Sequence, residues 1–148
     1  MSNDVAALVE VVSNLPTVES VSSLESFLLD LPQTDLGTRN LIHGGMCART
    51  ILIPAGTVLT GALTNLDNIS VVYGDITVTT DEGAQRLTGF HVLPAKSGAK
   101  RAGLAHADTW WAMVWPTELT DIEEIEDEIT PESGKLQTRQ TTLLTEGN

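Results

Sequence analysis

The sequence predicts an all-β fold, an antiparallel roll or barrel with helices at its ends. The first indication is a change of pattern near residue 46, where short β-branched runs begin to alternate with turn residues at intervals of about 8 to 12 residues. The second is that apolar residues recur at helical spacing before and after this region. The third is the length of 148 residues with 41% hydrophobic content, which suits one domain with one core.

Two helices are predicted ahead of the β region. Apolar residues at positions i, i+3, i+4 and i+7 predict a helix over 5–12, which Pro16 ends. A second apolar stripe predicts a helix over 21–31, with Ser22 and Glu25 spaced as a capping box. We expect both helices to dock on another part of the fold.

Eight strands are predicted in the β region, which is enough to close a roll. Turn sequences rich in Gly, Asp, Asn and Pro separate them, including Gly74-Asp75 and Asp81-Glu82-Gly83. The predicted strands span 47–53, 57–63, 69–73, 76–80, 84–88, 90–94, 100–104 and 109–115.

An acidic amphipathic helix is predicted after Pro116. Thr120 and Glu123 are spaced as a capping box, and isoleucines line one side of the helix while acids line the other. The residues that follow are polar, and we expect them to be flexible without a partner. The chain is thus divided into a helical N-terminal arm and lead-in (1–45), the β-barrel (46–116), the acidic helix (117–130) and a flexible C-terminal tail (131–148).

Charge is distributed unevenly along this acidic chain, whose net charge is −12. The region 47–116 is balanced by five bases and five acids, whereas 1–31 and 117–148 are acidic. Binding to a phosphate backbone depends on clustered Lys and Arg, so nucleic acid is a poor partner. No apolar run approaches the roughly 20 residues of a membrane span, so a membrane is not expected to be a partner.

The cysteine content and the N-terminus predict the compartment. The single Cys47 cannot form an intrachain disulfide, and it lacks a nearby base, so we expect it to lie in the core or at an interface. The N-terminus carries acids where a secretory signal carries Lys or Arg. Both observations favour synthesis in a cytoplasm.

Four motifs along the chain resemble those of one known family. They are an R-x-I-x-I-P-A-G-T segment, a G-D-hydrophobic-x-V segment, an S-G-x-K-R loop and a D-T-x-W strand followed by an acidic helix, at 49–57, 74–78, 97–101 and 108–111. Together they resemble the small cupin-like (RmlC-type) proteins of tailed bacteriophages over about residues 31–129. The resemblance implies a cupin-like β-roll, synthesis in a host cytoplasm and a place in or around the virion.

One departure from the family pattern bears on chemistry. Such proteins commonly place a histidine just after the second strand and another a few residues on, whereas Thr64 and Asn68 stand near those positions here. Divalent transition metals prefer imidazole and carboxylate ligands, and Thr and Asn are poor substitutes. We therefore expect neither a metal nor another cofactor.

A metal-free sugar epimerase is one alternative function. RmlC-type epimerases use a His–Asp pair as a general base, so His106 with Asp108, or His91, are the candidates, with Tyr73 as the proton donor. The favoured interpretation is that His106 and Asp108 are ordinary turn residues and that no residue is catalytic.

Small-molecule binding is a second alternative. A nucleotide or sugar captured in the barrel mouth would make the protein an accessory or anti-defence factor. The residues expected to line that mouth are Arg49, Arg86, Lys100 and Trp111.

The favoured function is assembly through protein contacts. Along the strand 109–115, Trp111 and Trp115 share one face and Trp110 takes the other, so both faces are expected to be covered. The basic cluster around Ser97 is expected to pair with the acidic helix of the same or a neighbouring subunit. The predicted interface residues are Trp110, Trp115, Ile122, Ile125, Lys96 and Arg101.

These expectations describe a non-enzymatic, homo-oligomeric phage module, decorating the virion or associated with its tail. Its partners are then further copies of itself and other phage or host proteins. A remaining alternative is an acidic decoy for a DNA-binding protein, with 118–128 imitating a row of phosphates.

Overall fold

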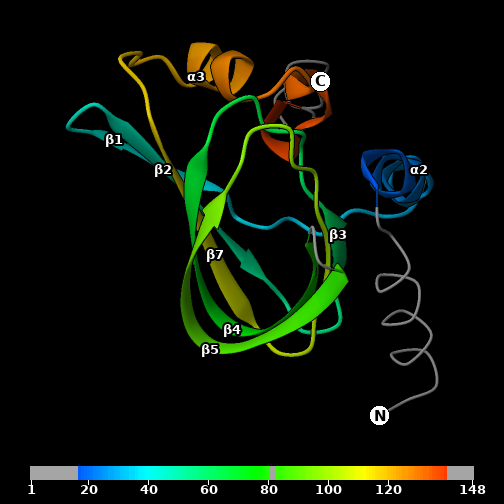
Figure 1. Cartoon of the computed structure of the whole chain (residues 1–148). Coiled ribbons are helices and arrows are strands. Elements are labelled where there is room, and N and C mark those ends of the chain that lie inside the picture. The colour runs from blue at the N-terminus through cyan, green and yellow to red at the C-terminus, as the bar shows by residue number, and fades with distance from the viewer. Residues whose placement is uncertain (1–16, 81–82, 140–148) are drawn as a thin grey trace.

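The computed structural model describes residues 17–80 and 83–139. The helix predicted over 5–12 lies outside these residues. The described chain forms α2 (Val18–Leu29), β1 (Arg39–His43), β2 (Met46–Ile53), β3 (Val58–Thr60), β4 (Asn68–Thr80), β5 (Gly83–Ala95), β6 (Ala102–Ala105), β7 (Thr109–Pro116), α3 (Ile122–Ile129) and the 3-10 helix η1 (Ser133–Lys135), as Figure 1 shows. Over the described residues, no helix has the length and apolar content needed to cross a membrane.

The strands form one antiparallel sheet that curls around the core. Its order is β1-β2-β7-β4-β6-β3, with β5 paired along the full length of β4. Residues 69–73 of β4 pair with β7, and residues 76–78 pair with β6. The β4–β5 hairpin therefore runs across both halves of the sheet, which Figure 1 shows as a curved band. The predicted all-β, antiparallel roll is confirmed.

The turn predicted at Gly74-Asp75 is wrong, because β4 continues through it as a bent strand. Gly74 has a φ of +153°, and a Cβ built there would lie 2.5 Å from Thr109 Oγ1. The close approach of β7 thus requires glycine at this bend. Gly74 pairs with Gly89, so the predicted strands 84–88 and 90–94 likewise merge into β5.

The sheet begins earlier than the predicted boundary at residue 46. β1 pairs with β2 through a tight turn at Gly44 and Gly45, which have φ values of +60° and +75°. Two consecutive residues with positive φ are typical of the hairpin turn that matches strand twist. The lead-in predicted over 1–45 therefore contains an edge strand.

Two hydrophobic clusters make up the core. One lies inside the curl of the sheet and contains Ile53, Val72 and Ile76. The other lies between the sheet and α3 and contains Cys47, Trp115, Ile125 and Ile129. The predicted amphipathic side of the acidic helix is confirmed, and Cys47 is buried as expected.

Both helices begin at a residue other than the predicted cap. Thr17 caps α2 by accepting a hydrogen bond from the Ser20 N–H, and Asp121 caps α3 in the same way. The predicted capping boxes at Ser22/Glu25 and Thr120/Glu123 are wrong. Ser, Thr, Asp and Asn all cap helices well, so several start positions were compatible with the pattern.

The described part of the C-terminal tail is held against the fold, contrary to the prediction of flexibility. The Gln137 side chain accepts a hydrogen bond from the Leu36 N–H and donates one to the Thr34 carbonyl oxygen. Arg139 donates to Glu126 and to the Glu123 carbonyl oxygen. Residues 140–148 of the predicted tail lie outside the described chain.

Candidate functional site

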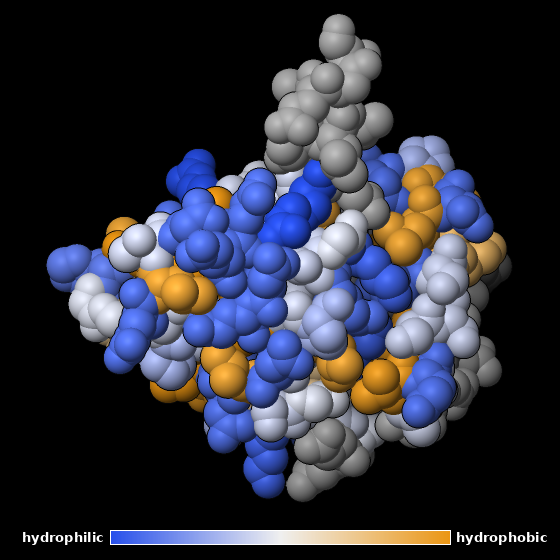
Figure 2. Space-filling model, turned by 90° about the horizontal axis from the view of Figure 1, so that it is seen from above, coloured by the Kyte–Doolittle hydropathy of each residue, from blue (hydrophilic) through white to orange (hydrophobic). Residues whose placement is uncertain are grey.

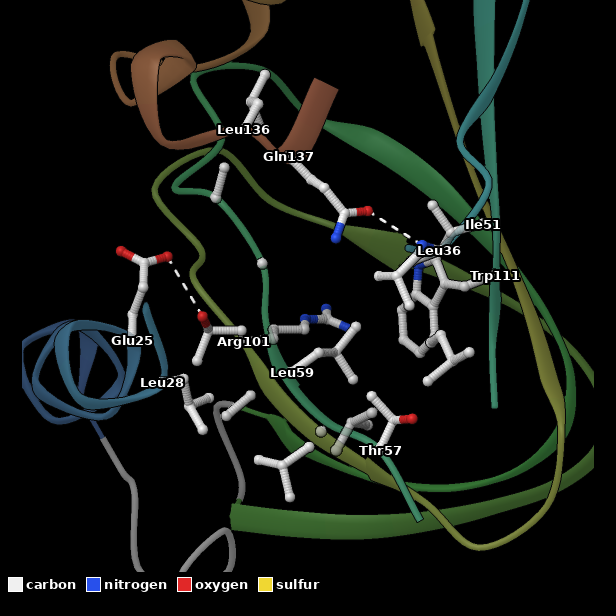
Figure 3. Close-up of a pocket in the computed structure, with 18 of the residues that line it drawn as sticks. Glu25, Leu28, Leu36, Ile51, Thr57, Leu59, Arg101, Trp111, Leu136 and Gln137 are labelled. Carbon is white, nitrogen blue, oxygen red and sulfur yellow. Dashed lines mark hydrogen bonds between the residues drawn. The ribbon is translucent and has the colours of Figure 1, made fainter. Parts of the chain in front are cut away.

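A cavity of about 710 Å³ lies inside the curled sheet. Its walls come from the concave face of the sheet, from α2 and the segment after it, and from the residues that follow η1. Figure 3 shows apolar side chains from each of these parts facing the cavity, among them Leu28, Leu36, Leu59 and Leu136. The Trp111 indole forms part of the opposite wall (Figure 3).

Two arginines also line the cavity. Arg49 is held in place by Glu126 Oε2 at 2.9 Å and by Thr138 Oγ1 at 3.1 Å. Arg101 reaches into the cavity (Figure 3), although the sequence favoured an interface role for it. Glu25 and Lys135 line it as well, so the cavity combines apolar walls with side chains of both charges.

Of the four residues expected to line a binding site, two do so. Arg49 and Trp111 belong to the cavity wall, and their role in binding a ligand stays a prediction. Arg86 lies elsewhere, and it donates two hydrogen bonds to Asp75 on the neighbouring strand, which lower the pKa of that carboxyl. The Lys100 ammonium is wholly buried in an ion-pair cluster outside the lining.

Thr64 and Asn68, which stand near the histidine positions of the resembled family, both line the cavity. Asn68 is only 6% exposed. The Thr64 hydroxyl oxygen and the Asn68 amide oxygen are buried, and neither has a hydrogen-bond partner in the structure. Buried polar atoms nearly always have such partners, so these two oxygens are exceptions within the described chain.

A cluster of four charged residues ties α2 to the C-terminal segment at the rim of the cavity. Lys100 Nζ lies 3.0 Å from Glu25 Oε2 and 2.6 Å from Glu132 Oε1. Lys135 Nζ bridges the same two carboxylates, at 3.1 Å from each. This cluster is not visible in the sequence, because its members are distant in the chain and the position of Glu25 fits a capping box.

The Glu132 carboxyl is the most perturbed group of this cluster. Burial alone would raise its pKa, but hydrogen bonds from Lys100, from the Leu63 N–H and from Lys135 favour the charged form more strongly. The pKa is lowered to about 2. Glu132 is therefore ionised whenever the fold is intact near neutral pH.

The acidic helix α3 pairs with bases other than those predicted. Glu126, a buried acid of α3, binds Arg49 at 2.9 Å and Arg139 at 2.9 Å. Within the cluster around Ser97, Lys100 instead pairs with acids outside α3. Lys100 therefore does not pair with the acidic helix as predicted.

The predicted catalytic residues do not assemble into a site. His106 Nε2 lies 2.7 Å from Thr77 Oγ1, whereas Asp108 Oδ1 accepts a hydrogen bond from the Ala55 N–H. His91 binds the carbonyl oxygen of Thr88, and Tyr73 is 61% exposed. The oriented His106–Asp108 pair is not formed, and none of the four residues lines the cavity.

The outer, convex face of the sheet carries a second candidate surface. Tyr73 on β4 pairs in register with Phe90 on β5 and with Trp110 on β7. These three aromatic side chains form one row, with exposed fractions of 61%, 65% and 43%. Four further apolar residues extend the face over β1, β2, β4 and β5 and are about half exposed or more: Leu41, Met46, Ile69 and Val92.

This surface corrects the predicted interface. Trp110 is exposed as expected, but Trp115 and Ile125 are buried in the second core cluster. Ile122 packs against that cluster, and Arg101 lines the cavity. The alternation of Trp110 and Trp111 between the two faces of the sheet was predicted correctly, and Lys96 is exposed.

No family model and no curated protein match the sequence. Solved structures of cupin-domain proteins resemble the fold. Ectoine synthase from P. lautus has 20% identity and a TM-score of 0.49, over 67% of this chain and 76% of that one. KdgF from Halomonas sp. has 17% identity and a TM-score of 0.48, over 64% and 93%. A cupin superfamily protein from Desulfitobacterium hafniense has 13% identity and a TM-score of 0.48, over 64% and 88%.

Proposed function

We propose that this protein is a non-enzymatic cupin-like module that acts through protein–protein contacts and pairs with a second copy of itself. The observation that carries the proposal is the apolar outer face formed by β1, β2, β7, β4 and β5. Soluble monomers rarely expose a large contiguous apolar patch, and such patches usually mark interaction sites. Tyr, Trp and Phe at its centre are the residue types enriched at interfaces.

The dimensions of the face suit a dimer. Five strands spaced about 4.8 Å apart are about 24 Å wide, and eight residues of β2 at about 3.3 Å each are about 26 Å long. The face thus covers roughly 600 Å² in each copy, and two copies would bury roughly 1,200 Å². That area lies at the lower end of the range for specific interfaces, about 1,200–2,000 Å².

The charge distribution favours a second copy as the occupant. Side-chain alternation along the five strands places one acid on the outer face, Asp75, which is paired with Arg86. Arg39 and His43 at the β1 edge are basic or neutral. Figure 2 shows the mainly hydrophilic end of the molecule seen from above. Two chains of net charge −12 repel each other, so contact is favoured on a face whose one acid is already paired with a base.

The setting of this assembly comes from the resemblance to phage proteins. We propose a decoration or tail-associated role, with synthesis in the host cytoplasm and incorporation into the virion. Other phage or host proteins would then contact the surfaces that the pair leaves free.

Light scattering of the purified chain tests the proposal. We expect a dimer in solution and a folded monomer when Phe90 and Tyr73 are both replaced by Glu, because charge on the outer face opposes its burial. The matched control is Phe27→Glu on α2, which is 63% exposed and lies off this face, and it should remain dimeric. A monomeric wild-type chain, or a double variant that is still dimeric, would contradict the proposal.

A further inference from the structure

One edge of β5 is open. The 13 residues of this strand pair with β4 on one side, and no other strand of residues 17–80 and 83–139 pairs with them. Figure 1 shows β5 at the margin of the curved band, beside β4. The open edge of a strand presents N–H and carbonyl groups without partners, so it is a template for pairing with another chain.

The hydrogen bonds of the neighbouring strand show which groups of β5 point to this edge. The backbone N–H and carbonyl oxygen of Asp75 both bond to the segment 106–109, on the side away from β5. Thr88 lies opposite Asp75, so in an antiparallel ladder its own N–H and carbonyl oxygen point to the open edge. Alternate residues point the same way, so the backbone groups of Phe90 and Val92 also face the open edge.

Two exceptions on this edge complement each other. Pro94 continues the same alternation but has no N–H to donate. The Thr88 carbonyl oxygen already accepts a hydrogen bond from His91 Nε2 at 2.8 Å, so it needs no donor from another chain. A second, antiparallel β5 can set its Pro94 opposite Thr88, which matches the residue without a donor to the carbonyl that needs none. In other registers that overlap these residues, an N–H meets the occupied Thr88 oxygen or Pro94 faces a carbonyl that lacks a donor.

The side chains around this match suit a copy of the same strand. In this register Phe90 lies opposite the partner's Val92, and the two residues exchange two backbone hydrogen bonds. Aromatic and β-branched side chains that lie opposite each other stabilise strand pairs. The segment 87–95 contains no Asp, Glu, Lys or Arg, although such charges commonly protect edge strands from pairing.

We propose that the open edge of β5 pairs with the same edge of a second copy, antiparallel and with Thr88 opposite the partner's Pro94. The two curled sheets then become one continuous sheet. This contact goes beyond the one proposed for the outer face, because it uses backbone groups at the edge of the sheet and not the side chains of its face. Two different self-contacts on one chain allow pairs to join into larger assemblies. The paired segment is short, so the edge contact is the weaker of the two.

Sedimentation velocity of the full chain over about a hundredfold range of concentration tests the edge contact. We expect the mass to rise above that of a pair at the highest concentrations. His91 lies opposite the partner's His91 at the centre of the contact. Its strand neighbour Val72 is buried inside the curl, so His91 lies on the inner side of the sheet, away from the outer face. His91→Lys should weaken this association about fivefold or more, because like charges opposite each other oppose pairing.

A charge swap tests the register. An equal mixture of His91→Lys and His91→Glu should associate better than either variant alone, because the two charges attract each other across the contact. The matched control is Gln85→Lys, at an exposed position of the same strand outside the paired segment, which should associate as the wild type does. The proposal is overturned if the mass does not rise with concentration, if His91→Lys associates as the wild type does, or if the mixture associates no better than either variant.

The same data separate the two self-contacts. A chain that is monomeric at low concentration, and that associates only through a contact sensitive to His91→Lys, retains the edge contact and loses the face contact. A dimer whose mass is constant over the whole range of concentration does the reverse.

Discussion

Replacing Glu132 by Gln removes one negative charge from the cluster that surrounds the buried Lys100 ammonium. The amide can still accept hydrogen bonds from Lys100 and from the Leu63 N–H, so the change acts mainly on charge. A folded-state pKa of about 2 against an ordinary value of 4.5 corresponds to about 3 kcal/mol of folding free energy. We therefore expect the variant to be about 3 kcal/mol less stable than the wild type at pH 7.

The sign of the pH dependence follows from the lowered pKa. A carboxyl whose pKa is lower in the folded state contributes its full stability above the unfolded-state value of 4.5 and loses it as pH falls toward about 2. The stability difference between wild type and Glu132→Gln should therefore shrink to about 1.4 kcal/mol at pH 3, because the carboxyl is then mostly protonated in the unfolded chain and still mostly ionised in the folded one.

Urea unfolding followed by tryptophan fluorescence at pH 7, 5, 4 and 3 measures this difference directly. Glu118→Gln is the matched control, because Glu118 is exposed and its loss should change stability little at any of these pH values. A wild-type–variant difference that stays constant from pH 7 to pH 3 would show that Glu132 does not act through its charge, and the electrostatic account of the cluster would fail.

The remaining predictions concern the bend in β4 and the buried thiol. Gly74→Ala should destabilise the fold by about 3 kcal/mol or more, because the new Cβ would lie 2.5 Å from Thr109 Oγ1. Gly89→Ala, at φ +80°, meets no atom within 4 Å and should cost about 1–2 kcal/mol through backbone strain alone. Equal losses of stability in urea unfolding would contradict this difference. Cys47 is fully buried and burial raises its pKa, so a thiol reagent should modify it only in denaturant, and rapid modification of the native protein would refute this.

The sequence was sufficient to predict the class of fold, because period-two alternation and turn residues are local signals. It predicted the positions of most strands and the opposite orientations of Trp110 and Trp111. It could not separate a glycine in a turn from a glycine within a strand, since both positions require the same conformational freedom. Gly74 therefore looked like a turn, and only the approach of Thr109 reveals why glycine stands there.

The candidate site was predicted less completely than the fold. Thr64 and Asn68 were identified as replacements for histidines, but their unpartnered oxygens depend on which backbone groups surround them. The ion-pair cluster was beyond sequence reasoning, since Lys100 and Glu25 are 75 residues apart and no periodicity links them. Arg101 was predicted to lie at an interface because the sequence shows its charge but does not show that its side chain points into the cavity.

The same cluster has a consequence for the order in which the chain is completed during synthesis. Glu25 lies in α2, near the start of the described chain, and its partner Lys135 follows 110 residues later. A ribosome makes the N-terminal end first, so α2 is exposed while every strand of the sheet is translated. The ion pairs that fix this helix to the rim therefore form only after both lysines and Glu132 have emerged.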